Sequence, residues 1–304
     1  MPGKVRLYGY FGHGNLGDEA LRETWIAALA PEFRVHTCSP PRPPVARGPW
    51  LFCGGLLQDR TSIRSLAFYA AAIRFASGRG PVGLAGIGVE LHRGAARGLV
   101  KAALARVGYL SVRDAPSQEA LAALGFEARL FPDPVLSWTP PPRRGEGGLL
   151  LNLVPTLPSG LRARAVAEAL SLGEALGTRV KGLAMSPADV PALKGLPVLR
   201  PATPAQALEL VAAASLVIAA RLHALELALV AGTPFVALPY AGKVEAFLQL
   251  VERELPAPVP RAPGGAEDLL GGDWRRGLLR ARDRLREEAR EGIEDVRRWL
   301  RALA

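Results

Sequence analysis

The stretch AARLHALELALVAGTPFVALPYAGK, residues 219–243, decides the fold. An apolar run over 215–220 leads into it and is typical of a buried strand. The segment LHALELALVAG that follows has the length and the good helix formers of a helix that ends at Gly232. A second apolar strand, 235–238, comes next. Strand, helix and strand in this order predict a βαβ unit in a parallel sheet, whose carboxyl edge holds ligands.

Basic side chains follow both strands of this unit. Arg221 and His223 come directly after the first strand, and Lys243 lies just beyond the second. An arginine and a histidine at such an edge suit an anionic substrate and a proton transfer. The alternative is that Arg221 caps a neighbouring carbonyl and His223 is a structural residue at the helix start. The local sequence leaves both interpretations open.

The length allows two domains, and apolar strands that alternate with helices indicate an α/β protein. A chain of 304 residues can bury two cores of ordinary size, and a hydrophobic content of 49% excludes disorder. No apolar run approaches the ~18 residues that span a bilayer. The start, MPGKVRLYGY, enters a strand without a secretory apolar region, so we expect a cytoplasmic protein. Cys38 and Cys53 are too few for a disulfide framework or a zinc site.

The net charge of +10 is carried mostly by arginine and favours acidic partners. Acidic partners of this kind include phosphorylated substrates, nucleic acids and anionic membrane faces. The arginines are scattered over expected helix faces, aromatic residues make up 6% of the chain, and no nucleic-acid-binding motif occurs. We therefore expect no nucleic-acid partner.

Breaks in the strand–helix rhythm predict the domain organisation. The proline- and glycine-rich run TPPPRRGEGG, 139–148, is typical of an interdomain linker. We predict an N-terminal Rossmann-like domain over 1–140, a C-terminal one over 149–252, and a linker with a C-terminal helical segment over 253–304. The last segment interleaves Arg and Glu beside a broken apolar stripe. We expect it to pack on the domains, and docking on a membrane or partner is the alternative.

A glycine-rich turn follows the first strand. Gly12, Gly14 and Gly17 formally match the dinucleotide fingerprint, but the next strand, 34–38, ends without the acidic residue that a ribose requires. A nicotinamide site is therefore not expected. The turn instead predicts an anion cradle at a helix N-terminus. Asn15 and Asp18 either cap that helix or contact substrate.

Further polar residues follow later strands of the first half. Gln58 and Asp59 are expected in a loop before the next helix, after the pair Gly54 and Gly55. Arg113 falls at the carboxyl end of a strand over 109–113.

Six motifs in this order resemble the polysaccharide pyruvyltransferase family, of the type that pyruvylates secondary cell-wall polymers. They are GYFGHGNLGDEA (9–20), CGGLLQDRTSIRS (53–65), GIGVEL (86–91), LSVRDAPSQEAL (110–121), DPVL (133–136) and RLHALELALVAGTPFVALPYAGK (221–243). The resemblance implies a GT-B-like fold, with two Rossmann-like domains whose parallel sheets face a cleft, followed by a C-terminal helical tail. Two departures are Leu153-Val154-Pro155, where many relatives carry an arginine, and GIGVEL, which lacks the more usual proline.

The resemblance also implies a reaction. Phosphoenolpyruvate and a sugar with two suitably placed hydroxyls would give a cyclic pyruvate ketal and phosphate. By this resemblance His223 is the proton-transfer residue and Arg221 the anion clamp, with Arg113 and Lys243 as further anion contacts. The remaining substrate contacts, mainly on the acceptor side, are Gly12, Gly14, Asn15, Asp18, Gln58 and Asp59.

The implied partners are phosphoenolpyruvate as donor substrate and a sugar acceptor carried on a lipid. Contact with an anionic membrane at its inner face is a further expectation. No cofactor and no metal ion are expected. Two other interpretations stay open: a GT-B glycosyltransferase that uses a nucleotide sugar, with Glu226 near the position of a ribose-binding carboxylate, and a basic surface-binding protein without catalytic activity.

Overall fold

A computed structural model of the chain describes residues 3–60, 62–142, 147–238, 240–261, 266, 269 and 272–303. The chain divides into two compact units. Unit 1 comprises 1–13, 18–134 and 287–304, and unit 2 comprises 14–17 and 135–286. The domain boundaries expected from the sequence stay a prediction, and four residues of the expected linker, 143–146, lie outside the described residues.

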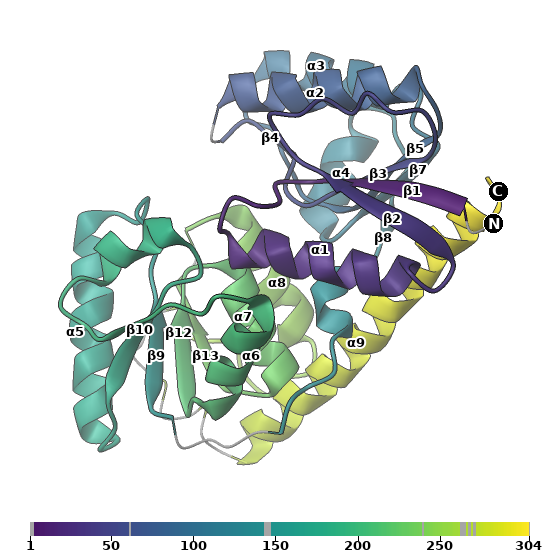
Figure 1. The fold of residues 1–304 in the computed structure, drawn as a ribbon. Coiled ribbons are helices and arrows are strands. Elements are labelled where there is room, and N and C mark those ends of the chain that lie inside the picture. The colour runs from purple at the N-terminus through teal and green to yellow at the C-terminus, as the bar shows by residue number, and fades with distance from the viewer. Residues whose placement is uncertain are drawn as a thin grey trace. The chain divides into compact units, whose positions relative to one another are not determined.

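Unit 1 is built on a six-stranded parallel sheet (Figure 1). Its strands in spatial order are β2 (Phe33–Cys38), β1 (Gly3–Tyr8), β3 (Trp50–Cys53), β5 (Val82–Ile87), β7 (Tyr109–Val112) and β8 (Arg129–Leu130). A short parallel pair, β4 (Leu57–Gln58) and β6 (Val89–Glu90), extends beyond it. Gln58 therefore lies in a strand and not in the loop that the sequence predicts, because β4 pairs with the residues that follow β5.

Helices cover both faces of this sheet, as expected for a doubly wound fold. The helices are α1 (Leu16–Leu29), α2 (Ile63–Ser77), α3 (Gly94–Leu104) and α4 (Ala115–Ala122). Side chains of β3 alternate between the two cores: Trp50 and Phe52 pack with α2 and α3, whereas Leu51 and Cys53 pack with α1.

Unit 2 contains a five-stranded parallel sheet in the order β11-β10-β9-β12-β13. Its strands are β9 (Leu149–Asn152), β10 (Val180–Leu183), β11 (Val198–Leu199), β12 (Leu216–Ala219) and β13 (Phe235–Ala237). Its helices are α5 (Ser159–Ala175), α6 (Pro204–Ala213), α7 (Leu222–Ala231) and α8 (Gly242–Glu252), with 3-10 turns η1 (Pro134–Ser137) and η2 (Pro187–Leu193). The opening βαβ unit is thus β12, α7 and β13. Helix α7 ends at Gly232, whose φ of 68° is the left-handed conformation that favours glycine.

The long C-terminal helix α9 (Gly272–Arg301) contributes to both units. In unit 2, the ring of Trp274 packs edge-to-face on that of Phe235. In unit 1, Val296 and Leu300 enter the α1 side of the core. The apolar stripe of α9 is buried, as expected of a helix that packs on the domains.

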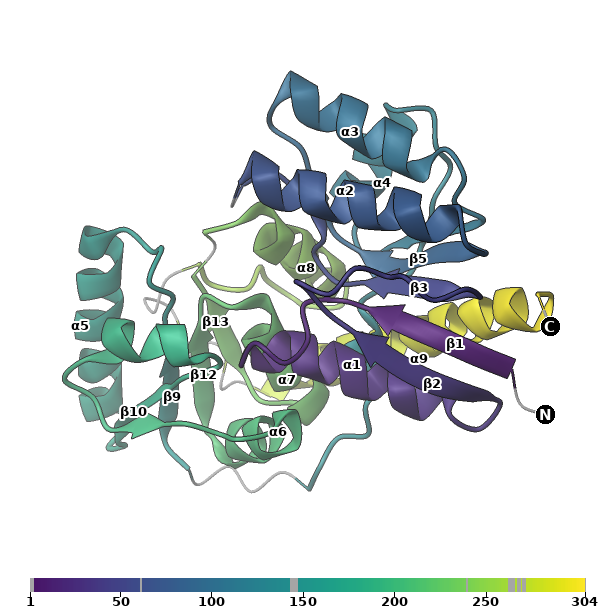
Figure 2. The ribbon, with the colours of Figure 1, turned by 45° about the horizontal axis from the view of Figure 1, so that its top comes forward.

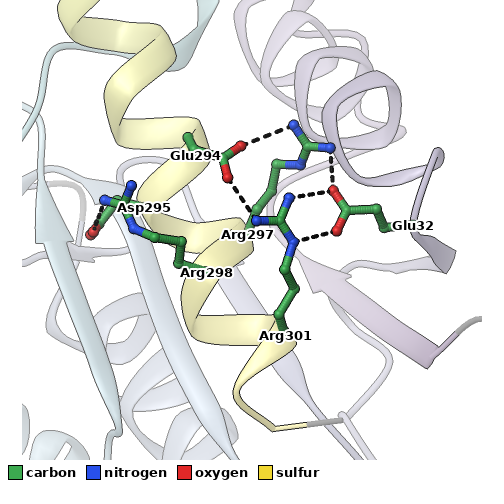
Figure 3. A network of polar contacts seen from close by, with 6 residues as sticks. All are labelled: Glu32, Glu294, Asp295, Arg297, Arg298 and Arg301. Carbon is green, nitrogen blue, oxygen red and sulfur yellow. Dashed lines mark hydrogen bonds and ion pairs between the residues drawn. The ribbon is translucent and has the colours of Figure 1, made fainter.

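Charged residues hold the end of α9 within unit 1 (Figure 3). Arg297 and Arg301 both donate to the carboxylate of Glu32 and to that of Glu294. Hydrogen bonds from Arg301 and, to a smaller extent, from Arg297 lower the pKa of Glu32 to about 2. No described helix is both long enough and apolar enough to cross a membrane.

Candidate functional site

Arg221 lies between the end of β12 and the start of α7 in unit 2. Its backbone amide donates to Oδ1 of Asn152 at 3.0 Å. Its guanidinium donates to the carboxylate of Asp189, from Nε at 2.7 Å and from Nη2 at 2.5 Å. This bidentate ion pair fixes both the position and the plane of the guanidinium.

Asp189 is the centre of a buried polar network. Its side chain is fully buried, and its Oδ2 also accepts hydrogen bonds from the amides of Met185 and Ser186, both at 3.1 Å. Asn152, likewise buried, donates to the carbonyl of Leu183 at 2.9 Å. Each partner of Arg221 is therefore itself held by the backbone around β9 and β10.

Sequence reasoning assigned no role to Asn152 or Asp189. Asp189 lies in the first turn of η2. A signal was present in LLLN, 149–152, where an asparagine ends an otherwise apolar and buried strand. A buried amide needs hydrogen-bond partners, so its position pointed to a polar contact at this edge.

His223 is the second residue of α7 and only 13% of its side chain is exposed. Its ring packs directly on the backbone of Gly17, since a Cβ at Gly17 would lie 2.1 Å from Nδ1. Its Nε2 lies 3.7 Å from Oε2 of the buried Glu226, one helical turn further along. The imidazole is therefore fixed between a glycine and a carboxylate.

The glycine-rich turn is divided between the units. Gly14 has a φ of +73° and its Cα faces Pro187 of η2, while Leu16 donates its amide to the carbonyl of Met185 at 2.9 Å. Asn15 accepts a hydrogen bond from the amide of Gly17 at 3.3 Å, as a residue at a helix start does. Gly14, Asn15 and Gly17 thus belong with Arg221 and His223 in unit 2.

Gly12 belongs to unit 1 and is exposed. Its φ is +79°, and its amide donates to Oε1 of Glu19 at 2.5 Å. Asp18, in the first turn of α1, lies near Gly54 at the end of β3. Burial raises the pKa of the neighbouring Cys53 thiol, and the negative charge of Asp18 adds to this effect. Cys53 is therefore a protonated thiol at neutral pH.

Arg113 is buried at the carboxyl end of β7 in unit 1. Its Nη1 donates to Asp133 at 3.2 Å and its Nε lies 3.8 Å from Asp114. Asp114 also caps α4 by accepting from the amide of Ser117 at 2.8 Å. The charge of Arg113 is thus balanced by two carboxylates of its own unit.

Asp59 is buried, and both of its carboxylate oxygens accept hydrogen bonds from backbone amides. The donors are His92 at 2.9 Å and Arg93 at 2.8 Å, where α3 begins. Burial alone would raise the pKa of Asp59, but the two amides and the neighbouring charges outweigh burial and lower it. This geometry favours a structural role in which Asp59 fixes the two residues that precede α3, and the expected sugar contact stays a prediction.

The remaining expected residue, Lys243, lies in the first turn of α8 and is half-buried. It follows β13, so it belongs to the same sheet edge as Arg221. The expected site residues therefore divide between the units: Gly14, Asn15, Arg221, His223 and Lys243 belong to unit 2, and Gly12, Asp18, Gln58, Asp59 and Arg113 belong to unit 1.

A cavity of about 550 Å³ adjoins the Asp189 turn in unit 2. Its lining is mostly apolar and includes Met185, Pro187, Pro191 and Pro201, with Arg200 as its cation. Ser186 lines the cavity and also donates to Asp189. An apolar cavity with few polar groups is the usual form of a small-molecule site.

Comparison with known proteins identifies a family and a fold. The family model described as polysaccharide pyruvyl transferase matches residues 15–242. Among curated proteins none matches the chain significantly.

Solved structures match over nearly the whole chain at low identity. One is UDP-GlcNAc 2-epimerase of Methanocaldococcus jannaschii in complex with UDP-GlcNAc and UDP, with 13% identity, a TM-score of 0.54, and coverage of 98% of this chain and 99% of that one. Another is the glycosyltransferase SnogD of Streptomyces nogalater, with 15% identity, a TM-score of 0.50 and full coverage of both chains. At such identities the likeness concerns the fold alone, which is GT-B-like as the sequence predicts.

Proposed function

This chain belongs to the polysaccharide pyruvyl transferase family, and from that premise we propose that it transfers pyruvate from phosphoenolpyruvate to a sugar of a cell-wall polysaccharide precursor. The methylene carbon of the donor gains a proton, two sugar hydroxyls form bonds to its central carbon, and the bond from that carbon to the phosphate oxygen breaks. One hydroxyl proton balances the new methyl group and the other leaves with phosphate. The products are a cyclic ketal and inorganic phosphate.

The observation that carries this proposal is the Arg221–Asp189 ion pair beside His223. The donor has a carboxylate and a phosphate, and a guanidinium with a fixed plane suits either group. Asp189 accepts hydrogen bonds from Nε and Nη2, so the plane of the Arg221 guanidinium is already fixed in the structure. A cation that is already positioned needs no reorganisation when charge develops on the departing phosphate.

His223 is the proposed proton-transfer residue. It lies two positions after Arg221, and contact with Gly17 on one side and Glu226 on the other limits its movement. The carboxylate of Glu226 is placed to orient the imidazole. One positioned acid or base contributes roughly 10²- to 10⁴-fold to a rate. Lys243, at the same edge, is the proposed second anion contact.

The acceptor is proposed to meet polar groups of the unit 1 edge. Asp18 and Gln58 supply a carboxylate and an amide, the groups that sugar hydroxyls prefer as partners. Gly12, Gly14 and Asn15 would contribute backbone and amide contacts from the turn, and Arg113 would contact an anionic group of the acceptor.

The alternative, a nucleotide-sugar-dependent glycosyltransferase, has weaker support. Glu226 is the residue near the position of a ribose-binding carboxylate, and only 1% of it is exposed. Its carboxylate lies beside His223. Thermal shift with phosphoenolpyruvate and with a set of nucleotide sugars separates the two functions, because each predicts stabilisation by its own donor.

Phosphate release from phosphoenolpyruvate in the presence of lipid-linked acceptors tests the reaction. We expect release only when a suitable acceptor is added, and a loss of about 10²-fold or more in His223→Ala. His92→Ala is the matched control, since His92 is an exposed histidine that pairs with Glu90. Normal turnover by the His223→Ala variant would remove the proposed role of that residue.

A further inference from the structure

The outer face of α2 and α3 in unit 1 combines positive charge with exposed aromatic rings. The two helices lie side by side in both views of the ribbon (Figures 1 and 2). Their inner faces enter the same core cluster, with Leu66 and Ile73 from α2 and Val100 and Leu104 from α3. Because both inner faces contact one core, both outer faces point away from the sheet. We call this surface the α2–α3 face, formed by the exposed residues Arg64, Phe68, Phe75, Arg79, Arg97 and Lys101.

Negative charge is nearly absent from this part of the chain. Neither α2 nor α3 contains an acidic residue, and the one carboxylate in 60–107 is Glu90, which pairs with His92. Basic residues of the same stretch are Arg60, Arg64, Arg74, Arg79, Arg93, Arg97, Lys101 and Arg106. In α9, by contrast, the arginines are interleaved with acidic residues.

Two phenylalanines stand among these cations. Phe68 is 37% exposed and Phe75 is 42% exposed. With Arg64 they follow the i, i+4, i+11 spacing that places residues on one helix face. The guanidinium of Arg79 lies over the ring of Phe75, 4.2 Å from its centroid. Binding to a membrane surface gains from buried apolar area and from attraction between cations and anionic lipids, and the α2–α3 face offers groups for both.

We propose that the α2–α3 face binds the surface of an anionic lipid bilayer. The guanidinium and ammonium groups contact lipid phosphates, while Phe68 and Phe75 enter the headgroup layer. An anionic bilayer offers phosphates to the cations and an apolar layer to the rings. A partner that offered only negative charge would leave the rings in water. The inference does not depend on the proposed reaction, since it concerns a surface outside the candidate site.

Flotation of the purified full-length protein with vesicles tests the proposal. We expect binding to phosphatidylcholine mixed with phosphatidylglycerol, weak binding to phosphatidylcholine alone, and loss of binding as salt is raised. Neutralising one cation near an anionic bilayer lowers partitioning about fivefold. Arg64→Gln, Arg97→Gln and Lys101→Gln together should therefore lower it by about a hundredfold.

The aromatic variant Phe68→Ala with Phe75→Ala should also lower binding to the anionic vesicles. Its matched control is Leu170→Ala with Arg164→Gln on α5, which removes an exposed apolar residue and a cation from unit 2 and should bind like the unaltered protein.

Acetylation of lysines in the unaltered protein gives a test that does not depend on the folding of any variant. Anionic vesicles should protect Lys101 from acetylation and leave the exposed Lys194 reactive.

Three results would overturn the proposal. The first is equal acetylation of Lys101 with and without anionic vesicles. The second is unchanged binding by the triple glutamine variant. The third is unchanged binding by the aromatic variant together with equally tight binding of short duplex DNA, which would assign the face to polyanions in general.

Discussion

Asp189 accepts two hydrogen bonds from the guanidinium of Arg221, one from Nε at 2.7 Å and one from Nη2 at 2.5 Å. The carboxylate is fully buried, while 21% of the arginine side chain is exposed. A buried charge is tolerated when it is paired and hydrogen-bonded, and the amides of Met185 and Ser186 complete the set of donors to Asp189. The ion pair therefore stabilises unit 2 and also fixes the orientation of the Arg221 side chain.

Replacement of Asp189 by alanine should destabilise the protein by about 3 kcal/mol or more, because it leaves a partly buried guanidinium and two amides without their acceptor. Urea unfolding measures the change. Arg164→Ala on α5 is the control, since it breaks an exposed ion pair with Glu168 and should cost less than about 1 kcal/mol. Equal losses of stability in the two variants would show that the Asp189 network contributes nothing particular.

Asp189→Asn should also raise the KM for phosphoenolpyruvate, as measured by the release of phosphate.

Gly17→Ala should lower both stability and activity. An alanine suits a helix better than a glycine, so propensity alone predicts a gain of about 1 kcal/mol. The new Cβ would instead lie 2.1 Å from Nδ1 of His223 and displace the ring. Thermal unfolding and phosphate release measure the two effects.

Two variants separate this contact from a general effect of alanine. Gly98→Ala in α3 has no heavy atom within 4 Å of its added Cβ and should be neutral or stabilising. Adding His223→Ala to Gly17→Ala should restore the lost stability, because it removes the ring that the Cβ meets. Failure of this rescue would show that His223 is not what excludes a side chain at Gly17.

Asp59→Asn should destabilise the protein at neutral pH by about 1 kcal/mol, since the buried carboxylate of Asp59 accepts hydrogen bonds from the two amides that precede α3. The pKa of Asp59 is lowered in the folded protein, so its carboxylate stabilises the fold above the unfolded pKa of about 3.9. That contribution is lost as the pH falls through the folded pKa. The difference between the two proteins should therefore shrink below about pH 4. Asp283→Asn, an exposed substitution on α9, should show no such dependence. A difference that stays constant down to pH 2 would contradict this role of the carboxylate.

Glu32→Gln should loosen the end of α9, because Glu32 receives hydrogen bonds from Arg297 and Arg301. These bonds lower the pKa of Glu32 to about 2 from its model-peptide value of 4.5. The stabilisation is complete above pH 4.5 and is lost as the pH falls toward 2. Urea midpoints of the two proteins should converge in that range. Exchange of the backbone amides of 294–301 should be faster in the variant at neutral pH, and equal rates would show that the arginines hold α9 through other contacts.

Most of the longer strands and helices could be predicted from the sequence, because apolar runs and helix periodicity are local properties. The run from β12 to β13 shows this, with Gly232 marking the end of α7. The family could also be predicted, since its motifs are contiguous segments that keep their order in the chain. Gln58 was placed in a loop because β4 is two residues long and depends on pairing with β6, which is distant in sequence.

The sequence by itself determined two parallel α/β sheets and the family, and it predicted that Arg221 and His223 follow the end of a strand. Only the tertiary structure decided which residues hold Arg221 and His223 in place. Asn152 and Asp189 are 69 and 32 residues from Arg221, and hydrogen bonds over such separations leave no periodic pattern in the sequence. The contact of His223 with Gly17 likewise depends on a missing side chain, and a glycine in a turn has several explanations until a neighbour is seen to occupy the space.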